Sequence, residues 1–276
     1  MGRGRRRIGC VAGGGALVVA HAVGSGLPAP QRPLAVCGRY ASARPPAELA
    51  QLFHVAEIKA EPLDPNWNVA PTEPVYAVAE SRGVRQLGLF RWGLVPSWAP
   101  SPAVGARMIN ARAETVATKP AYRQALARRR CIVPADAFYE WAVVEKGQPP
   151  STSTRPRKQP YAIARRDGGP LAFAGLWEVW HDPDDPGGPP LRSCVIITTS
   201  ANDAVSAVHD RMPVVLPPEA WDRWLDRDDQ DVDGVSRLLV PAPPDDFVLW
   251  PVGTEVNKAD ANGPHLLVPL ESRYDS

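Results

Sequence analysis

The sequence predicts an α+β fold built mainly on antiparallel β-sheet. Eight short runs rich in β-branched and aromatic residues indicate strands, whereas only three segments have helical character. The 276 residues, 44% of them hydrophobic, can fill one sizeable core. The 32 prolines indicate many loops, and the nine tryptophans are typical of places where apolar and polar contacts meet.

The predicted elements follow one another along the chain. Leu49, Leu52 and Phe53 recur at helical spacing and predict a helix over 46–55. Further helices are predicted over 121–130, where three final arginines suit the helix dipole, and over 218–225. Two segments rich in Pro, Gly or charge, 145–160 and 181–190, are predicted to be loop insertions. Strands are predicted over 75–80, 84–92, 131–133, 138–144, 161–165, 171–180, 193–199 and 247–252.

The first 36 residues differ from the rest of the chain. They begin with arginines, continue with Gly, Ala and Val, and end near two prolines, which resembles a secretory signal peptide. Glycines interrupt the apolar stretch, however, and no run is long enough to span a membrane. Such a composition is also what GC-rich DNA encodes when it is translated outside a gene. We therefore expect 1–36 to be a non-native or cleaved extension and 37–276 to be one domain.

Charge and cysteine content set weak limits on partners. The net charge is +1, but residues 37–180 carry 19 Lys and Arg against 12 Asp and Glu, while 181–276 carry seven against 18. The basic part could follow a phosphate backbone, and the acidic run over 226–233 could simply solvate a surface helix and its loop. The four cysteines fit no zinc pattern, and Cys131 and Cys194 lie in apolar runs typical of reduced core residues. We expect a cytoplasmic protein without a metal or cofactor.

Several short segments concentrate residues that a plain core does not need. The segments are Cys37-Gly38-Arg39-Tyr40, Asn68-Val69-Ala70-Pro71-Thr72, Arg91-Trp92-Gly93-Leu94-Val95-Pro96-Ser97-Trp98, Asn110-Ala111-Arg112-Ala113-Glu114-Thr115, Phe138-Tyr139-Glu140-Trp141, Thr199-Ser200-Ala201-Asn202, His209-Asp210-Arg211-Met212-Pro213 and Val256-Asn257. In this order they resemble the SRAP family (SOS response-associated peptidase), and the resemblance runs from Cys37 to about Val268. It implies a barrel-like, mainly antiparallel core with short peripheral helices.

The resemblance implies that the chain traps abasic sites in single-stranded DNA as a covalent adduct. In that family the initiator Met is removed and the next residue, here Cys37, becomes the N-terminus; Asn110, Glu140 and His209 would complete the active site. Elementary chemistry agrees with this role for Cys37. A free N-terminal cysteine carries an amine and a thiol on adjacent carbons, with pKa values near ~8 and ~8.5, and the pair can close a thiazolidine ring on an aldehyde. An internal cysteine has an amide in place of the amine and cannot.

The other motif residues receive expected roles. Glu140 could shuttle protons, His209 could protonate the sugar ring oxygen, and Asn110 could hold the amine or the aldehyde oxygen. Taken singly, each of these residues has an ordinary structural explanation, and only the ordered set of motifs favours a site. The guanidinium groups of Arg39, Arg112 and Arg211 fit phosphate oxygens, and Trp67, Trp98 and Trp141 could stack on unpaired bases.

The sequence departs from the family at its beginning, since 35 residues precede Val36. Val36 could be a GTG start codon, the segment could be cleaved, or this member could be inactive; the composition favours the first. Two other functions stay open: a cysteine peptidase that uses Cys37, His209 and Asn110, and a non-catalytic reader of modified bases. We expect a monomer without a membrane partner, whose peptidase activity only uncovers its own Cys37.

Overall fold

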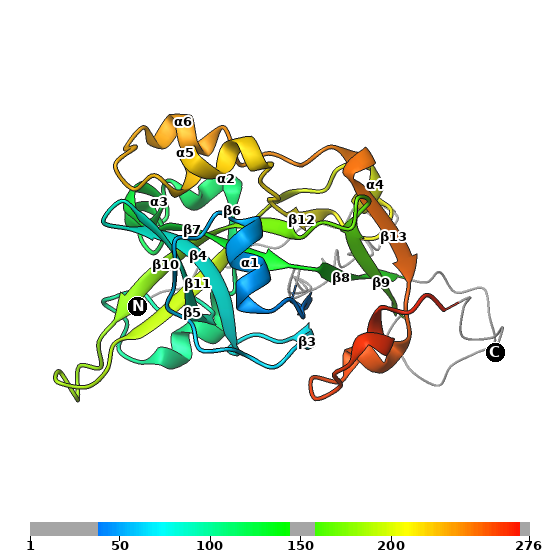
Figure 1. Cartoon of the computed structure of the whole chain (residues 1–276), viewed down its shortest axis with the longest axis horizontal. Helices are drawn as coiled ribbons and strands as arrows, with labels where there is room; N and C mark the ends of the chain where they lie inside the picture. The colour runs from blue at the N-terminus through cyan, green and yellow to red at the C-terminus, as the bar shows by residue number, and fades with distance from the viewer. Residues whose placement is uncertain (1–37, 144–157, 271–276) are drawn as a thin grey trace, which may run out of the picture. The chain divides into compact units, whose positions relative to one another are not determined.

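The computed structural model describes residues 38–143 and 158–270, which form two β-sheets with short helices around them (Figure 1). The first sheet has five strands in the order β13-β9-β8-β1-β3, and every neighbouring pair is antiparallel. This sheet positions three of the segments singled out in the sequence, because each contributes a strand. Its strands are β1 (Tyr40–Ser42), β3 (Asn66–Val69), β8 (Ala137–Val143), β9 (Lys158–Arg165) and β13 (Phe247–Pro251).

The second sheet closes on itself. Its strands follow the order β12-β11-β10-β7-β4-β5-β2, and an additional pairing of β11 with β5 joins β11, β10, β7, β4 and β5 into a ring. Directions cannot alternate all the way around a ring of five strands, so one pair must be parallel; here it is β11 with β5. The strands are β2 (Glu57–Ile58), β4 (Pro74–Ser81), β5 (Val84–Trp92), β6 (Asn110–Arg112, beside β11), β7 (Arg130–Ala135), β10 (Leu171–Trp180), β11 (Leu191–Ser200) and β12 (Arg211–Pro213).

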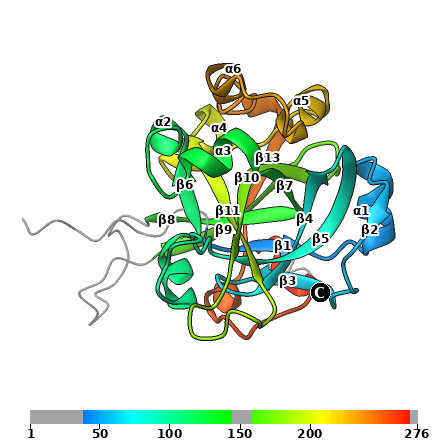
Figure 2. The same cartoon turned by 90° about the vertical axis from the view of Figure 1, so that its left-hand side faces the viewer.

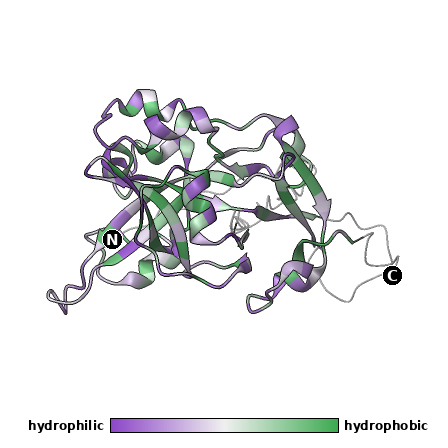
Figure 3. Ribbon diagram, viewed as in Figure 1, coloured by the Kyte–Doolittle hydropathy of each residue, from purple (hydrophilic) through white to green (hydrophobic). Residues whose placement is uncertain are grey.

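The strands of the ring are buried on both faces. Alternate residues belong to two core clusters, as Val75 and Ala77 show on one side and Tyr76 and Val78 on the other. The first cluster also takes in residues of β1, β8 and β9, so it joins the ring to the five-stranded sheet. The second cluster packs the ring against helices. In Figure 3 the ring strands are largely hydrophobic, whereas the loop between β10 and β11 is hydrophilic.

Short helices cover the outer face of the ring. The α5 and α6 helices lie close together in both views (Figures 1 and 2), and Trp224 of α5 donates its indole N–H to the carbonyl of Cys131 in β7 at 2.8 Å. Leu49 of α1 and Leu126 of α3 belong to the second cluster, together with Trp224. The helices are α1 (Pro46–Leu52), α2 (Ala113–Val116), α3 (Arg123–Arg128), α4 (Asp203–Ser206), α5 (Trp221–Leu225) and α6 (Val232–Ser236), with 3₁₀ turns at Pro102–Arg107, Pro218–Ala220, Pro244–Asp246, Thr254–Asn257 and Pro264–Leu267.

The α+β class and the antiparallel, barrel-like core are confirmed, and all eight predicted strands occur. The strands over 84–92 and 171–180 have the predicted ends, whereas the other six are shifted at one end or both. The helix expected over 121–130 ends at Arg128, because Arg130 starts β7. Arg130 nevertheless donates to the carbonyls of Leu126 and Ala127, so its charge does meet the end of that helix. The expected loop over 145–160 is wrong at its end, since β9 starts at Lys158; residues 144–157 lie outside the described part.

Two further expectations concern cysteines and membranes. Cys131 and Cys194 are fully buried free thiols inside the core, as their apolar runs predicted, and burial raises the pKa of the Cys194 thiol to about 12. Neither is therefore a reactive thiolate at neutral pH.

Among the described helices, none is long and apolar enough to cross a membrane.

Candidate functional site

Arg39, two residues after Cys37 in the sequence, lies at the entrance of β1. Cys37 itself lies outside the described residues. The Nη1 group of Arg39 donates to Oδ1 of Asn68 at 2.9 Å and to the carbonyl of Val256 at 3.2 Å. Burial lowers the pKa of the Arg39 guanidinium, and the carboxylate of Glu73 acts in the opposite direction. Arg39 therefore points at least one of its nitrogens inward, toward neutral acceptors.

Asn68 is the buried partner of Arg39 and lies in β3 at 1% exposure. Its Nδ2 group donates to the carbonyls of Lys258 at 2.8 Å, Ala261 at 3.0 Å and Val256 at 3.3 Å. The Asn68-Val69-Ala70-Pro71-Thr72 motif therefore holds the segment 256–261 of the C-terminal region against β3. The sequence singled out this motif without giving Asn68 a role.

Glu140 is a buried carboxylate in the middle of β8, with 1% exposure, opposite Tyr161 of β9. Side chains alternate along a strand, so Glu140 points to the same face as Phe138, which packs against the ring. Tyr139 and Trp141 point to the other face and pack with Val256. Burial of a carboxylate is costly unless a charge or a hydrogen bond compensates it, so the position of Glu140 is unlike that of an ordinary core residue. This favours a specific role for Glu140.

The β1–β8 pairing directs the start of β1 toward this carboxylate. Tyr40 pairs with Phe138 in antiparallel register, and the backbone N–H of Tyr139 donates to the carbonyl of Arg39 at 3.0 Å. Because the strands are antiparallel, Gly38, which precedes Arg39, lies toward the residue of β8 that follows Tyr139. The next residue of β8 is Glu140.

Asn110 begins β6 and is held by the ring of strands. Its backbone pairs with Ile196 of β11, and the carbonyl of the preceding Ile109 accepts a hydrogen bond from the indole of Trp92 at 3.0 Å. Trp92 is fully buried. The side chain of Asn110 is half-buried, at the start of a strand that the core fixes in place.

His209 follows α4 and has one ring nitrogen committed to local groups. Its Nδ1 accepts the backbone N–H of Arg211 at 3.0 Å and lies 3.0 Å from Oδ1 of Asp210. A nitrogen that accepts a hydrogen bond carries no proton, so the neutral ring is assigned a proton on Nε2. The Nε2–H group is then the donor that His209 has available.

Arg112 and Arg211 lie on strands that pair with the end of β11: Thr198 pairs with Arg112 of β6, and Ser200 pairs with Arg211 of β12. Arg211 binds Glu114 through both terminal nitrogens; the Nη2 donates to Oε2 of Glu114 at 3.0 Å and to the carbonyl of Thr198 at 2.8 Å. The hydrogen bond from Arg211 lowers the pKa of the Glu114 carboxyl. The side chain of Arg112 is exposed. Of the three arginines predicted to contact phosphate, Arg211 thus has a carboxylate partner.

The three predicted stacking tryptophans differ in exposure. Trp98 is 66% exposed, in the loop after β5. Trp141 is half-buried, and its indole N–H donates to Oδ1 of Asn257 at 2.7 Å. Trp67 is half-buried in β3, where its backbone carbonyl accepts the hydroxyl of Tyr139 at 2.7 Å. All three leave part of their surface available to a ligand.

The loop that carries Trp98 is fixed by two glycines. Gly93 has a φ of 124°, and its backbone touches that of Gly105 so closely that a Cβ atom on either residue would collide with the carbonyl of the other. The backbone N–H of Val95 donates to Oγ of Ser193, and the indole of Trp180 donates to the carbonyl of Ala99. Trp98 is therefore presented on a loop tied down on both sides.

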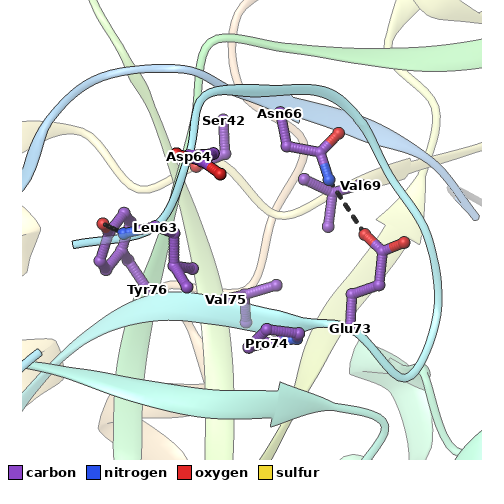
Figure 4. A pocket seen from close by; sticks show the side chains of 9 residues that line it. All are labelled: Ser42, Leu63, Asp64, Asn66, Val69, Glu73, Pro74, Val75 and Tyr76. Carbon is purple, nitrogen blue, oxygen red and sulfur yellow. Dashed lines mark hydrogen bonds between the residues drawn. The ribbon is translucent and has the colours of Figure 1, made fainter. Parts of the chain in front are cut away.

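A cavity of about 210 Å³ lies between β3 and β4, but it does not suit an anionic ligand (Figure 4). Asp64 and Glu73 line it, and no basic residue does. Glu73 accepts a hydrogen bond from Asn66, drawn as a dashed line in Figure 4. Ser42, at the end of β1 away from Cys37, also lines the cavity. Phosphate would be repelled here, so this cavity is not part of the candidate DNA site.

The structure adds three side chains that sequence reasoning missed. Asn68, Glu114 and Asn257 bind Arg39, Arg211 and Trp141, respectively. All three stand in motifs that the sequence singled out, but without a role assigned to them. Their contacts join segments distant in sequence, so no local pattern could have revealed the partners.

Comparison with known proteins identifies what the chain is similar to. The family model described as SOS response associated peptidase (SRAP) matches residues 36–259. The abasic site processing protein YoqW of Bacillus subtilis (strain 168) is 38% identical over 233 residues, covering 84% of this chain and 99% of the relative. The abasic site processing protein HMCES of Gallus gallus is 34% identical over 196 residues, covering 66% and 57%. A solved structure from Bacteroides thetaiotaomicron has a TM-score of 0.73 at 24% identity, covering 84% of this chain and 99% of the other, and shows the same fold.

Proposed function

The chain belongs to the SRAP family, and we propose on this basis that it processes abasic sites in DNA by trapping them covalently on an N-terminal Cys37. The family match begins at residue 36, so Cys37 stands at its start. The relatives named above are abasic site processing proteins. The observation that carries the mechanism is the backbone bond from Tyr139 to Arg39, which draws the chain after Cys37 toward the buried Glu140.

The proposed reaction begins with the ring-opened aldehyde of the abasic sugar. The Cys37 amine adds to the aldehyde carbon and a C–N bond forms. The carbonyl oxygen takes up one proton from the amine and one from the Cys37 thiol, and it leaves as water when the C–O bond breaks and the nitrogen lone pair forms a C=N iminium. The thiolate of Cys37 then adds to the same carbon, a C–S bond forms, and the nitrogen lone pair is restored. One aldehyde and one cysteine give one thiazolidine and one water. The reaction needs no oxidant, reductant or metal.

The side chains supply the proton movements in this proposal. Glu140, buried on the ring-facing side of β8, takes the proton from the Cys37 amine and returns it to the departing oxygen. His209 donates from Nε2 to the sugar ring oxygen, because its Nδ1 is occupied. Asn110, fixed at the start of β6, holds the amine or the aldehyde oxygen. Phe138, Ile109 and Met212, which stand within three residues of Glu140, Asn110 and His209 respectively, belong to one core cluster, and this supports a shared site.

Single-stranded DNA is the proposed substrate form. Arg39, Arg112 and Arg211 would contact phosphates, and the partly exposed Trp67, Trp98 and Trp141 would stack on bases, which is possible only where bases are unpaired. The bond between Cys37 and the residue before it would be the one peptide bond that this protein cleaves. We propose that it acts as a monomer.

The test is incubation with single-stranded DNA that contains one abasic site, followed by a denaturing gel. A variant that begins Met-Cys37 should give a species that survives denaturation, and Cys37→Ala in the same variant should not. The 276-residue chain that keeps its first 36 residues is the matched control, since its Cys37 nitrogen is an amide, and it should bind DNA without crosslinking. An equal adduct from Cys37→Ala would contradict the proposal.

A further inference from the structure

We propose that Asn68 is a positioning residue for the Cys37 reaction, whose buried amide fixes Arg39 and the segment 256–261 and so holds the start of β1 in its reactive place. This inference rests on the proposed function. It assigns a role in catalysis to a side chain that does not itself contact DNA or the reacting atoms.

The amide of Asn68 uses its hydrogen-bonding capacity on two different parts of the molecule. Oδ1 accepts from Nη1 of Arg39, and Nδ2 donates to the carbonyls of Lys258, Ala261 and Val256. The two N–H groups of an amide thus meet three acceptors, so one bond is shared. With 1% of Asn68 exposed, the groups that it binds are shielded from bulk water, so removal of the side chain leaves buried polar groups without their partner.

The first link runs from Asn68 to the residues that precede β1. The strand starts at Tyr40, so Gly38 and Arg39 extend beyond its end. Two kinds of contact hold Arg39: its carbonyl accepts the N–H of Tyr139, and its side chain is bound by Asn68 and the Val256 carbonyl. Loss of the Asn68 contact leaves Arg39 with the Val256 carbonyl alone for its side chain.

The second link runs from Asn68 to Trp141. The carbonyls of Val256 and Lys258 that Asn68 binds flank Asn257, and Asn257 accepts the indole N–H of Trp141 at 2.7 Å. Trp141 directly follows Glu140 in β8. One buried amide therefore connects the strand end leading to Cys37 with the side chain next to the proposed proton carrier.

If Asn68 acts by positioning, its variants should slow the reaction more than they weaken DNA binding. A shift of about 1 Å between reacting groups can slow a reaction about a hundredfold, while binding of a long substrate depends on many contacts elsewhere. Asn68→Ala should therefore lower the crosslinking rate at saturating DNA by about tenfold or more. The dissociation constant for DNA that carries a tetrahydrofuran residue, which has no aldehyde to react, should rise less than about threefold.

The experiment compares four proteins that begin Met-Cys37: the parent, Asn68→Ala, Asn68→Ser and Asn262→Ala. Asn262 also joins β3 to the C-terminal region, through Trp67 N–H and the carbonyl of Pro65, but it does not contact Arg39. Asn262→Ala should keep the parent rate at saturation. Asn68→Ser retains one small hydroxyl, and it replaces Asn68→Ala in the comparison if Asn68→Ala does not unfold cooperatively. The crosslinking rate of Asn68→Ser should also be lower than that of the parent. Thermal unfolding of each variant shows that the rates refer to folded protein.

The outcomes separate the inference from the function beneath it. If the parent forms no adduct, the proposed function fails. If the parent reacts and a folded Asn68 variant reaches the parent rate at saturation, the positioning role is overturned. The same holds if Asn262→Ala loses as much rate, or if an Asn68 variant weakens binding to the tetrahydrofuran DNA while its saturated rate is unchanged.

Discussion

Arg39 and Arg211 occupy two regions of the proposed DNA site and are held in opposite ways. Arg39 binds neutral groups, an amide oxygen and a main-chain carbonyl, and its charge has no carboxylate in direct contact. Arg211 binds both oxygens of Glu114, whose side chain is 52% exposed. Similar residues predicted for the same task thus differ in the charge that they can offer to a phosphate.

The difference shows that a hydrogen-bonded arginine is not always a neutralised one. Arg39 keeps its full positive charge while two neutral acceptors hold it in place, so in the proposed DNA complex it would bind phosphate without prior loss of a salt bridge. In the same proposed complex, Arg211 would have to share its guanidinium between Glu114 and DNA. In return, the carboxylate sets the orientation of the Arg211 fork before DNA arrives. The predictions below test this contrast in order of expected size.

The largest effect is expected on stability. Arg39→Met should lower the free energy of unfolding by about 1–3 kcal/mol, because Oδ1 of buried Asn68 and the carbonyl of Val256 lose a donor. Arg211→Met should lower it less, by about 0.5–1.5 kcal/mol, because the carbonyl of Thr198 loses a donor but the exposed Glu114 can be solvated. Urea denaturation of the two variants measures both values. Equal losses would mean that the two arginines are held alike.

The next effect concerns the salt dependence of DNA binding. Each phosphate contact to a single strand contributes about 0.7 to the slope of log affinity against log salt. Arg39→Met should remove about this amount, whereas Arg211→Met should remove less, because Glu114 already compensates its charge. Fluorescence anisotropy with tetrahydrofuran-containing DNA over a range of salt gives the slopes. An unchanged slope in Arg39→Met would show that Arg39 does not touch phosphate and serves only to position β1.

More of the fold than of the charge contrast between Arg39 and Arg211 could be predicted from the sequence. Long apolar runs such as 171–180 and 193–199 must be buried, so they identify strands without knowledge of their partners. The short β1, β3, β6 and β12 were missed because three or four residues carry too little pattern, and pairing with other strands makes them extended. Closure of the ring also depends on a parallel contact between β11 and β5, which no local signal reveals.

The site could be predicted only as a set of motifs. The order of the motifs pointed to Arg39, Glu140 and Arg211, yet the contacts of these residues come from distant parts of the chain. Asn68 binds carbonyls 188 to 193 residues away, and Arg211 binds a carboxylate 97 residues away. Residue type and spacing show that an arginine is present, whereas tertiary packing decides whether its partner is an amide or a carboxylate.

A smaller effect is expected from removing the charge of Glu114. Glu114→Gln keeps a side chain of the same shape, so Arg211 retains one oxygen acceptor but is no longer neutralised. Binding to tetrahydrofuran DNA at low salt should become about twofold tighter, which corresponds to the weak coupling of exposed ion pairs. In a Glu114→Gln, Arg211→Met double variant the gain should vanish. A gain that persists there would be due to the charge of Glu114 acting on DNA directly.

The smallest effect is the pH dependence of the Arg211–Glu114 pair. The hydrogen bond from Arg211 lowers the pKa of Glu114 below its ordinary value of 4.5 in the folded protein. Above pH 4.5 Glu114 is mostly ionised in both states, so the pair contributes fully to stability; as the pH falls below 4.5 the unfolded chain takes up the proton first, and the contribution is lost. Because Glu114 is half exposed, the loss should be only about 0.2–0.5 kcal/mol.

Urea denaturation at mildly acidic and strongly acidic pH should therefore show the stability difference between the parent and Glu114→Gln shrinking as the pH falls. For Arg39→Met the difference from the parent should change less, because the amide and carbonyl that bind Arg39 do not titrate. A difference for Glu114→Gln that stays constant through this range would show that Arg211 gains nothing from the charge of its partner, and the contrast between the two arginines would then lie in geometry alone.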